Sequence, residues 1–124
     1  MKELTQQNFY MAIQECLDTE HYKVLLVTET FKDLEVIITD WLQPIEHIIP
    51  DVIKIVKSRN NFHINFANGS YIRHISLNPS NIRGRRADLV LCKPWMMDDI
   101  SISCHLKACE LCNHYFTHGG FPDE

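Results

Sequence analysis

The sequence predicts a single α/β domain over residues 1–124, with a central mixed β-sheet, two N-terminal helices and a β-hairpin at about residues 61–77. Short, almost wholly apolar runs alternate with segments of helical periodicity, and an Asn-Gly pair separates two runs of alternating polarity. With 124 residues, of which 45 % are hydrophobic and 10 % aromatic, the chain has the composition of one folded globular domain. No repeat, low-complexity tract or flexible linker divides it.

The N-terminal part has the pattern of a helix followed by a strand–helix–strand unit. Thr5 can cap a first helix that continues to about Asp18 with one apolar stripe. Residues 23–28, Lys-Val-Leu-Leu-Val-Thr, are typical of a strand buried on both faces. Thr30, with an aspartate three residues later, begins a second helix that Pro44 should end or bend. A strand at residues 52–57 would complete a right-handed crossover.

The middle of the chain has a hairpin signal followed by another buried strand. Alternating apolar residues flank Asn68-Gly69, and this pair favours a tight turn because such a turn needs positive φ. Residues 88–92, Asp-Leu-Val-Leu-Cys, read as a short buried strand closed by Pro94. The last thirty residues leave two interpretations open. Residues 100–106 alternate like a strand, whereas residues 106–112 also fit one or two helical turns.

Positive charge is concentrated in the middle of an acidic protein whose net charge is −4. Residues 1–50 carry 3 positive and 9 negative side chains, residues 51–93 carry 8 and 2, and residues 94–124 carry 1 and 5. Four of the five arginines fall between Arg73 and Arg86. This distribution indicates a local anion site. Long nucleic acid fits less well, because acidic flanks would repel a duplex.

The arginine-rich segment has the chemistry of a phosphate site. Guanidinium groups bind phosphate through paired hydrogen bonds, and Gly84 lets the backbone approach a ligand closely. We therefore expect the segment to hold the phosphates of a small nucleotide, with Tyr71 and Trp95 as aromatic platforms for its base. The residues expected to bind are Arg73, Asn78, Ser80, Asn81, Arg83, Arg85 and Arg86.

A structural role is the alternative for the same arginines. In that interpretation the side chains are solvated or paired with the acidic flanks, as surface ion pairs are common and weak. We expect Asp88 to pair with one of these arginines rather than to act as a catalytic acid.

The Asn68-Gly69-Ser70 turn, followed by the Arg-Gly segment and apolar strand of residues 82–91, resembles the large-terminase ATPases of tailed phages and related helicase-like ATPases. The similarity covers about residues 20–93. In that family the arginine–glycine segment leads into the strand that ends in the magnesium-binding acid and the catalytic glutamate. The resemblance therefore implies an ATPase-like core of phage origin.

Two departures from the family remove its hydrolytic machinery. No Gly-x-x-x-x-Gly-Lys-Ser/Thr segment is present, so the phosphate loop is missing. Cys92-Lys93-Pro94 stands where the two acids of the family follow the strand, and a lysine there would repel magnesium. We expect no enzyme activity and reuse of the fold for binding.

In size and character the chain is also similar to phage anti-defence sponges that sequester the cyclic ADP-ribose signals of the Thoeris system. That similarity implies a non-catalytic protein that sequesters a cyclic nucleotide in the host cytoplasm, and we expect it to be a homo-oligomer. Two further alternatives remain: a degenerate terminase-like module that binds a protein partner, and a small zinc-binding regulator.

The cysteines bear on both cofactor and compartment. Cys109-x-x-Cys112, with Cys104 and His114 nearby, has the spacing of half a structural zinc site, the only cofactor the sequence suggests. Free, buried thiols are the alternative. An odd number of cysteines, five, argues against a complete disulfide framework. The N-terminal charge is not followed by the apolar run of a secretory signal. No stretch approaches the roughly 18 apolar residues of a membrane span. We therefore expect a cytoplasmic protein with reduced thiols and no membrane partner.

Overall fold

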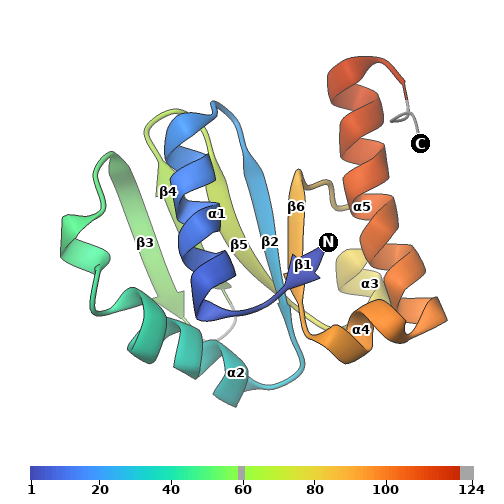
Figure 1. Cartoon of the computed structure of the whole chain (residues 1–124), viewed down its shortest axis with the longest axis horizontal. Helices are drawn as coiled ribbons and strands as arrows, with labels where there is room; N and C mark the ends of the chain where they lie inside the picture. The colour runs from blue at the N-terminus through green and yellow to red at the C-terminus, as the bar shows by residue number, and fades with distance from the viewer. Residues whose placement is uncertain (59–60, 121–124) are drawn as a thin grey trace.

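The computed structural model describes residues 1–58 and 61–120, whose strands form one mixed sheet of six strands in the order β1-β6-β2-β5-β4-β3 (Figure 1). The first four strands in this order are mutually parallel, and β4 is antiparallel to both β5 and β3. This sheet confirms the predicted α/β class. The strands are β1 (Lys2–Glu3), β2 (Lys23–Thr28), β3 (Val52–Ser58), β4 (Asn61–Phe66), β5 (Tyr71–Ser76) and β6 (Leu89–Cys92).

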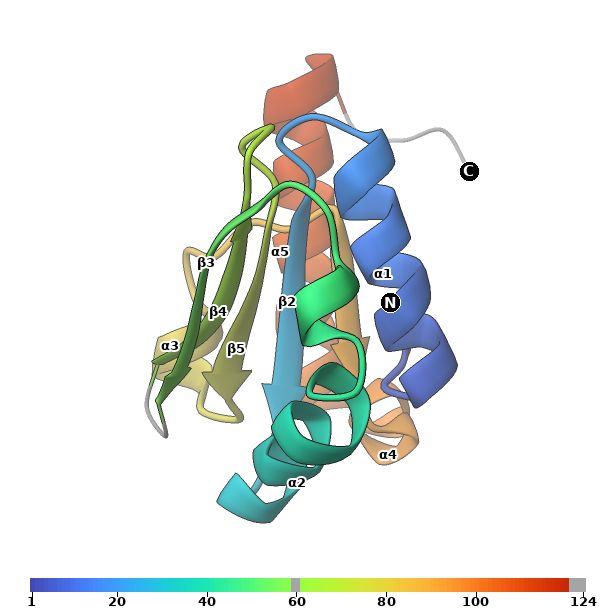
Figure 2. The ribbon, with the colours of Figure 1, turned by 90° about the vertical axis from the view of Figure 1, so that its left-hand side faces the viewer.

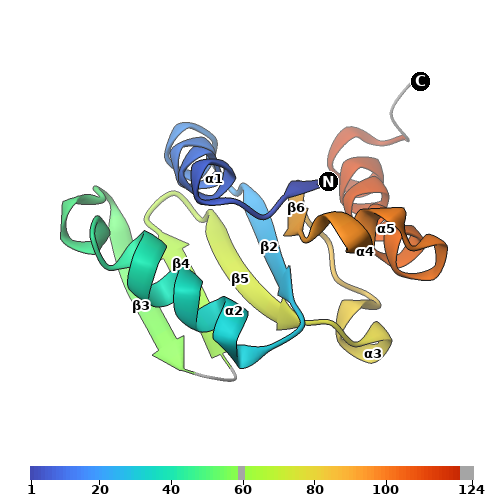
Figure 3. The same ribbon diagram turned by 60° about the horizontal axis from the view of Figure 1, so that its bottom comes forward.

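Helices cover both faces of the sheet (Figures 2 and 3). One face carries α1 and α2, and α2 continues as a π-helical segment, Ile37–Leu42; a short 3-10 turn, Glu46–Ile48, leads on to β3. The other face carries α3, α4 and α5. The α-helices are α1 (Gln6–Asp18), α2 (Phe31–Val36), α3 (Pro79–Ile82), α4 (Pro94–Asp98) and α5 (Ile100–His118).

Each face of the sheet has its own apolar core. The continuous apolar run of β2 supplies both, because successive side chains point to opposite faces and every residue from Val24 to Val27 is buried. Val24 and Leu26 pack with α1 and α2, whereas Leu25 and Val27 pack with α3, α4 and α5. Full burial of one such side chain contributes about 1.5–3 kcal/mol.

The two predicted N-terminal caps are confirmed. Thr5 Oγ1 accepts a hydrogen bond of 3.0 Å from the backbone N–H of Asn8, and Thr30 Oγ1 accepts one of 3.3 Å from Asp33. Each bond satisfies a backbone donor that the first helical turn leaves unpaired. The predicted crossover from β2 to β3 does not join neighbouring strands, because β5 and β4 lie between these two strands in the sheet.

The predicted hairpin is confirmed with a different turn. Gly69 N–H donates to Phe66 O at 3.2 Å, and Phe66 N–H donates to Ser70 O at 2.9 Å, so a three-residue loop joins β4 to β5. Positive φ is needed at Gly69 alone, where φ is 87°. This is the geometry of a type I turn closed by a left-handed glycine. Ser70 Oγ then ties the loop to Thr19 O at 2.6 Å.

The strand interpretation of residues 100–106 is wrong, because these residues begin the 19-residue helix α5. Asp99 Oδ1 caps this helix by accepting from Ile102 N–H at 3.0 Å, and Gly119, with φ of 76°, ends it. Leu106, Cys109 and Asn113 are its buried residues, at the spacing of one helical face. The short elements β1, α3 and α4 were not predicted.

Within the described residues, Asp88 forms no ion pair with any of the arginines from Arg73 to Arg86. Its two carboxylate oxygens accept hydrogen bonds of 2.8 Å from the backbone N–H of Lys23 and from Nδ2 of Asn113. Lys23 is the first residue of β2, and Asn113, which is only 3 % exposed, lies on the buried side of α5. The carboxylate therefore connects β2 to α5. Asp88 therefore holds the sheet and α5 together.

We predict that Asp88→Ala lowers the free energy of unfolding by about 2 kcal/mol, because it leaves the Lys23 N–H and the buried Asn113 amide without an acceptor. Urea denaturation measures the change. The matched control is Asp98→Ala, which removes an exposed carboxylate and should change stability by less than about 0.5 kcal/mol. Equal stability of the two variants would contradict this account.

Candidate functional site

The arginine-rich segment lies in the connection from β5 to β6, on the face of the sheet that carries α5. Ile82 and Ala87 are 1 % and 0 % exposed and pack in the core beneath α5, whereas residues 83–86 between them are exposed. Gly84 adopts a φ of 77°, a left-handed conformation that favours glycine. Two buried anchors with a left-handed turn between them therefore hold the three arginines on the surface.

These arginines line one groove between the connection and α5. The groove has a volume of about 540 Å³, within the range of small-molecule sites. The connection supplies one wall and α5 supplies the other. The lining residues are Ile82, Arg83, Gly84, Arg85, Arg86, His105, Ala108, Cys109, Cys112 and Phe116.

The charge of the groove is not neutralised from within. Within residues 1–58 and 61–120, no carboxylate forms an ion pair with Arg73, Arg83, Arg85 or Arg86. The Arg85 side chain donates through Nε to Asn81 O at 3.1 Å, and the Arg86 guanidinium lies 4.6 Å from the centre of the Phe116 ring. The alternative in which acidic flanks pair with these arginines is therefore absent from the described part of the chain.

Two further predicted residues, Tyr71 and Arg73, belong to β5 and lie near the arginine-rich segment. The Arg73 guanidinium is 4.5 Å from the centre of the Tyr71 ring. Burial raises the pKa of the Tyr71 hydroxyl, and the charges of Arg73, Arg85 and Arg86 act against that rise. Tyr71 thus lies within electrostatic range of three of the four predicted arginines, although it does not line the groove.

Asn78 and Ser80 bond to each other. Asn78 Oδ1 accepts from the backbone N–H of Ser80 at 3.0 Å and from its hydroxyl at 2.7 Å, and Asn78 O accepts from Asn81 N–H at 2.9 Å. These contacts form the first turn of α3. Asn81 adds a contact from Nδ2 to Ser76 Oγ at 2.9 Å. The three predicted polar residues therefore shape the loop, and Asn81 also supports Arg85.

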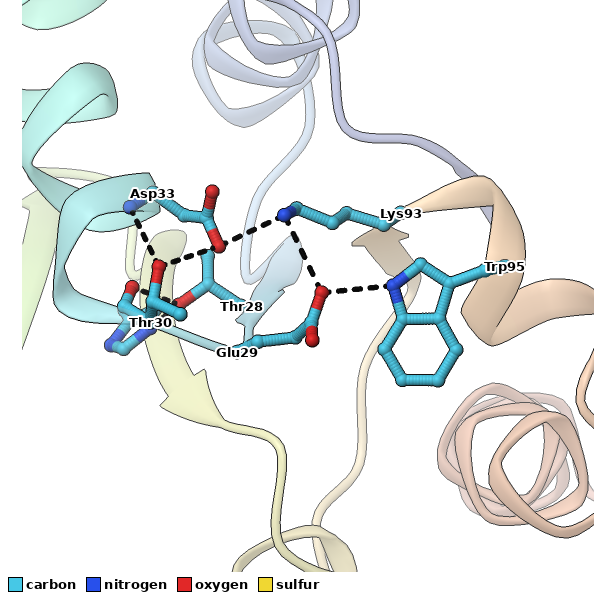
Figure 4. A network of polar contacts seen from close by, with 7 residues as sticks. Thr28, Glu29, Thr30, Asp33, Lys93 and Trp95 are labelled. Atoms are coloured by element: carbon cyan, nitrogen blue, oxygen red, sulfur yellow. Dashed lines mark hydrogen bonds and ion pairs between the residues drawn. The ribbon is translucent and has the colours of Figure 1, made fainter.

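The structure places Trp95 in a different cluster, at the carboxyl ends of β2 and β6 (Figure 4). Its indole N–H donates to Glu29 Oε1 at 2.9 Å. Lys93 Nζ lies 3.4 Å from the same Glu29 oxygen and 3.0 Å from Asp33 Oδ2. The expected pairing of Trp95 with the arginines is thus not seen, and an unpredicted network of charged residues surrounds Trp95 instead.

Lys93 is the cation of this second cluster. Burial tends to raise the pKa of the Asp33 carboxyl, but hydrogen bonds from Lys93 and Thr30 outweigh it and lower that pKa. The hydrogen bond to Asp33 in turn raises the pKa of Lys93. Both groups are therefore charged at neutral pH, and the ammonium group lies between two carboxylates.

The predicted zinc ligands are not brought together. Cys109 is buried and its thiol donates to Ile82 O at 3.5 Å, whereas Cys104 and Cys112 are exposed. His114 Nδ1 is 2.9 Å from Gly120 O, and its ring stacks on that of His118 at 4.1 Å. Over the described residues, no three His, Cys, Asp or Glu side chains form a group that could hold a metal ion.

Phe116 and His105 line the groove but were not predicted. The helical register of residues 100–118 contains the missing signal, because His105, Cys109, Cys112 and Phe116 recur at three- and four-residue intervals on one side of a helix. Phe116 is 68 % exposed, so an aromatic ring stands at the groove where Trp95 was expected to serve.

Comparisons with protein-family models, with curated proteins and with solved structures found no match to this chain. The resemblance to terminase ATPases therefore stays a prediction. Across the described residues, none of the helices combines the length and apolar character needed to cross a bilayer.

We predict that two of the five thiols, Cys104 and Cys112, react rapidly with Ellman's reagent in the folded protein. Burial raises the pKa of Cys16 to about 12 and those of Cys92 and Cys109 to about 11, so these three should react only after denaturation.

A Cys104→Ser variant supplies the control, because it should leave one fast thiol, Cys112 in the groove. Slow reaction of that remaining thiol would show that the groove is closed to solvent and contradict its geometry.

Proposed function

We propose that this protein binds a small phosphate-bearing molecule, of nucleotide type, in the arginine groove and holds it without chemical change. One observation carries the proposal. Arg83, Arg85 and Arg86, none of them ion-paired within the described residues, line a single groove together with the exposed ring of Phe116.

The groove offers the two kinds of contact that a nucleotide needs. Guanidinium groups form short, charge-assisted, paired hydrogen bonds with phosphate oxygens. An aromatic ring provides a stacking surface for a base, which contributes roughly 1–3 kcal/mol in single-stranded nucleic acid complexes. Arg86 already lies over Phe116 and can contact the same ligand. Phosphate would thus bind along the connection and the base would lie toward α5.

The remaining groups of the groove support binding without turnover. The residues that line it in the described part of the chain include no carboxylate. Burial raises the pKa of the Cys109 thiol to about 11, which keeps it protonated and a poor nucleophile. At the carboxyl edge, Lys93 lies between Glu29 and Asp33, where its charge would oppose a magnesium ion. Among the described residues, neither place has an unpaired carboxylate that could activate a water for phosphate hydrolysis.

Sequestration is the role that we propose for such binding. A protein that holds a nucleotide intact lowers its free concentration when the protein is in excess over the ligand. The resemblance to phage anti-defence sponges implies the specific form of this role that we propose: sequestration of a cyclic nucleotide signal of an antiviral defence in the host cytoplasm.

A second candidate function is protein binding through the outer side of α5. Ile100, Leu111 and Tyr115 are 82 %, 41 % and 45 % exposed on this helix. Leu111 does not line the arginine groove, so the two functions can be separated. Leu111→Ser should weaken capture of a protein partner and leave nucleotide binding unchanged.

We predict that Arg83→Gln and Arg85→Gln each weaken nucleotide binding about tenfold, because each removes charge-assisted hydrogen bonds to phosphate. Isothermal titration calorimetry with cyclic and linear adenine and guanine nucleotides measures the affinities. Mass spectrometry of the recovered ligand should find it unaltered.

The matched control is Lys32→Gln, which removes one positive charge from α2 on the opposite face of the sheet. Binding should keep its wild-type affinity in this variant. The proposal fails if no nucleotide binds the wild-type protein, or if all three variants lose affinity equally.

A further inference from the structure

A second hollow lies at the carboxyl end of β5. At this edge of the sheet, the connections that follow the neighbouring parallel strands β2 and β5 leave on opposite faces. β2 and β5 pair in parallel up to the Thr28–Ser76 pair. After β2 the chain leads to α2 on one face of the sheet, and after β5 it leads to α3 on the other face (Figure 3). Such a divergence marks the edge of an open α/β sheet where ligands usually bind. The hollow lies on the β5 and α3 side of this edge, since none of its lining residues belongs to β2 or to the segment after β2.

The hollow at this point has a volume of about 300 Å³ and is lined by His74, Ile75, Ser76, Asn81 and Arg85. Three of these residues, Ser76, Asn81 and Arg85, bring a hydroxyl, an amide and a guanidinium to the hollow. The arginine groove, by contrast, also has apolar walls and the Phe116 ring. The two spaces therefore suit different chemical groups.

Polar atoms of the hollow are held in place and still have bonding capacity. The imidazole of His74 lies on the α1/α2 face of the sheet, where its Nε2 is 2.6 Å from Thr28 Oγ1. The polar side chains of the hollow are therefore those of Ser76, Asn81 and Arg85. Asn81 Nδ2 donates to Ser76 Oγ at 2.9 Å. Among the described residues, Asn81 Oδ1 has no hydrogen-bond partner. Such fixed neutral donors and acceptors suit the hydroxyl groups of a sugar.

Arg85 lines both spaces, so one guanidinium stands where the hollow and the groove meet. A phosphate bound to Arg85 could carry one substituent into each space. We infer that the ligand is a nucleotide whose phosphates carry a second sugar, with the base in the groove near Phe116, the phosphates at Arg85 and the second sugar in the hollow. This inference rests on the proposed function of the arginine groove and specifies its ligand class.

Matched pairs of nucleotides test the inference: ADP against ADP-ribose, UDP against UDP-glucose, and GDP against GDP-mannose. Each pair shares its base and phosphates and differs in the second sugar. Calorimetry should show at least one pair in which the sugar-bearing member binds about tenfold more tightly. Both members should protect Cys112 from a thiol reagent while Cys104 stays reactive, because Cys112 lines the groove and Cys104 does not.

Asn81→Ala should remove the preference for the second sugar, since it deletes a polar side chain of the hollow and keeps the backbone carbonyl that bonds Arg85. Affinity for the member without the second sugar should stay within about twofold. Asn65→Ala, on β4, is the control for loss of an amide and should preserve the preference. Arg83→Gln should weaken both members of the pair, because Arg83 lines only the groove.

The outcomes separate the two proposals. Equal binding within every pair, with affinity unchanged by Asn81→Ala, would overturn the second-sugar inference and leave the arginine groove as a nucleotide site. No binding by any member of any pair, with Cys112 unprotected throughout, would overturn both.

Discussion

Burial of Ile82 and Ala87 beneath α5 is the constraint on which the proposed site depends. These two side chains fix both ends of a short segment as the chain returns from β5 to β6 across the sheet. The residues between them have no room in the core, so Arg83, Arg85 and Arg86 must lie on the surface facing α5. The core thus places three like charges close together, an arrangement that is favourable only when an anion or solvent offsets their repulsion.

The two polar clusters of the molecule differ in how their charges are balanced. At the carboxyl ends of β2 and β6, Lys93 bonds Glu29 and Asp33, and the charges there compensate one another. In the groove, the arginines have no such partners among the described residues. The first cluster is satisfied by the protein itself, whereas the second is open to a ligand. This contrast explains why we assign binding to the groove and not to the network around Trp95.

Sequence patterns predicted the parts of the fold that depend on local chemistry. The buried strand β2 follows from its apolar run, and the hairpin follows from Asn68-Gly69, although the turn needs positive φ only at Gly69. The C-terminal helix was ambiguous because alternating Ile100, Ile102 and Cys104 also fit a strand. Tertiary packing of Leu106 and Cys109 decides for a helix, and only that register brings Phe116 to the arginines. Trp95 was misplaced because α4, which carries it, was not predicted.

The most direct measurement is a titration of the protein with pyrophosphate, observed through the side-chain Nε–Hε resonances of its arginines by NMR. The account predicts that the resonances of Arg83, Arg85 and Arg86 shift together and saturate with one dissociation constant, because one anion contacts all three. Two results would contradict the account: dissociation constants that differ among the three resonances, or shifts that grow without saturation, as non-specific ionic screening would produce.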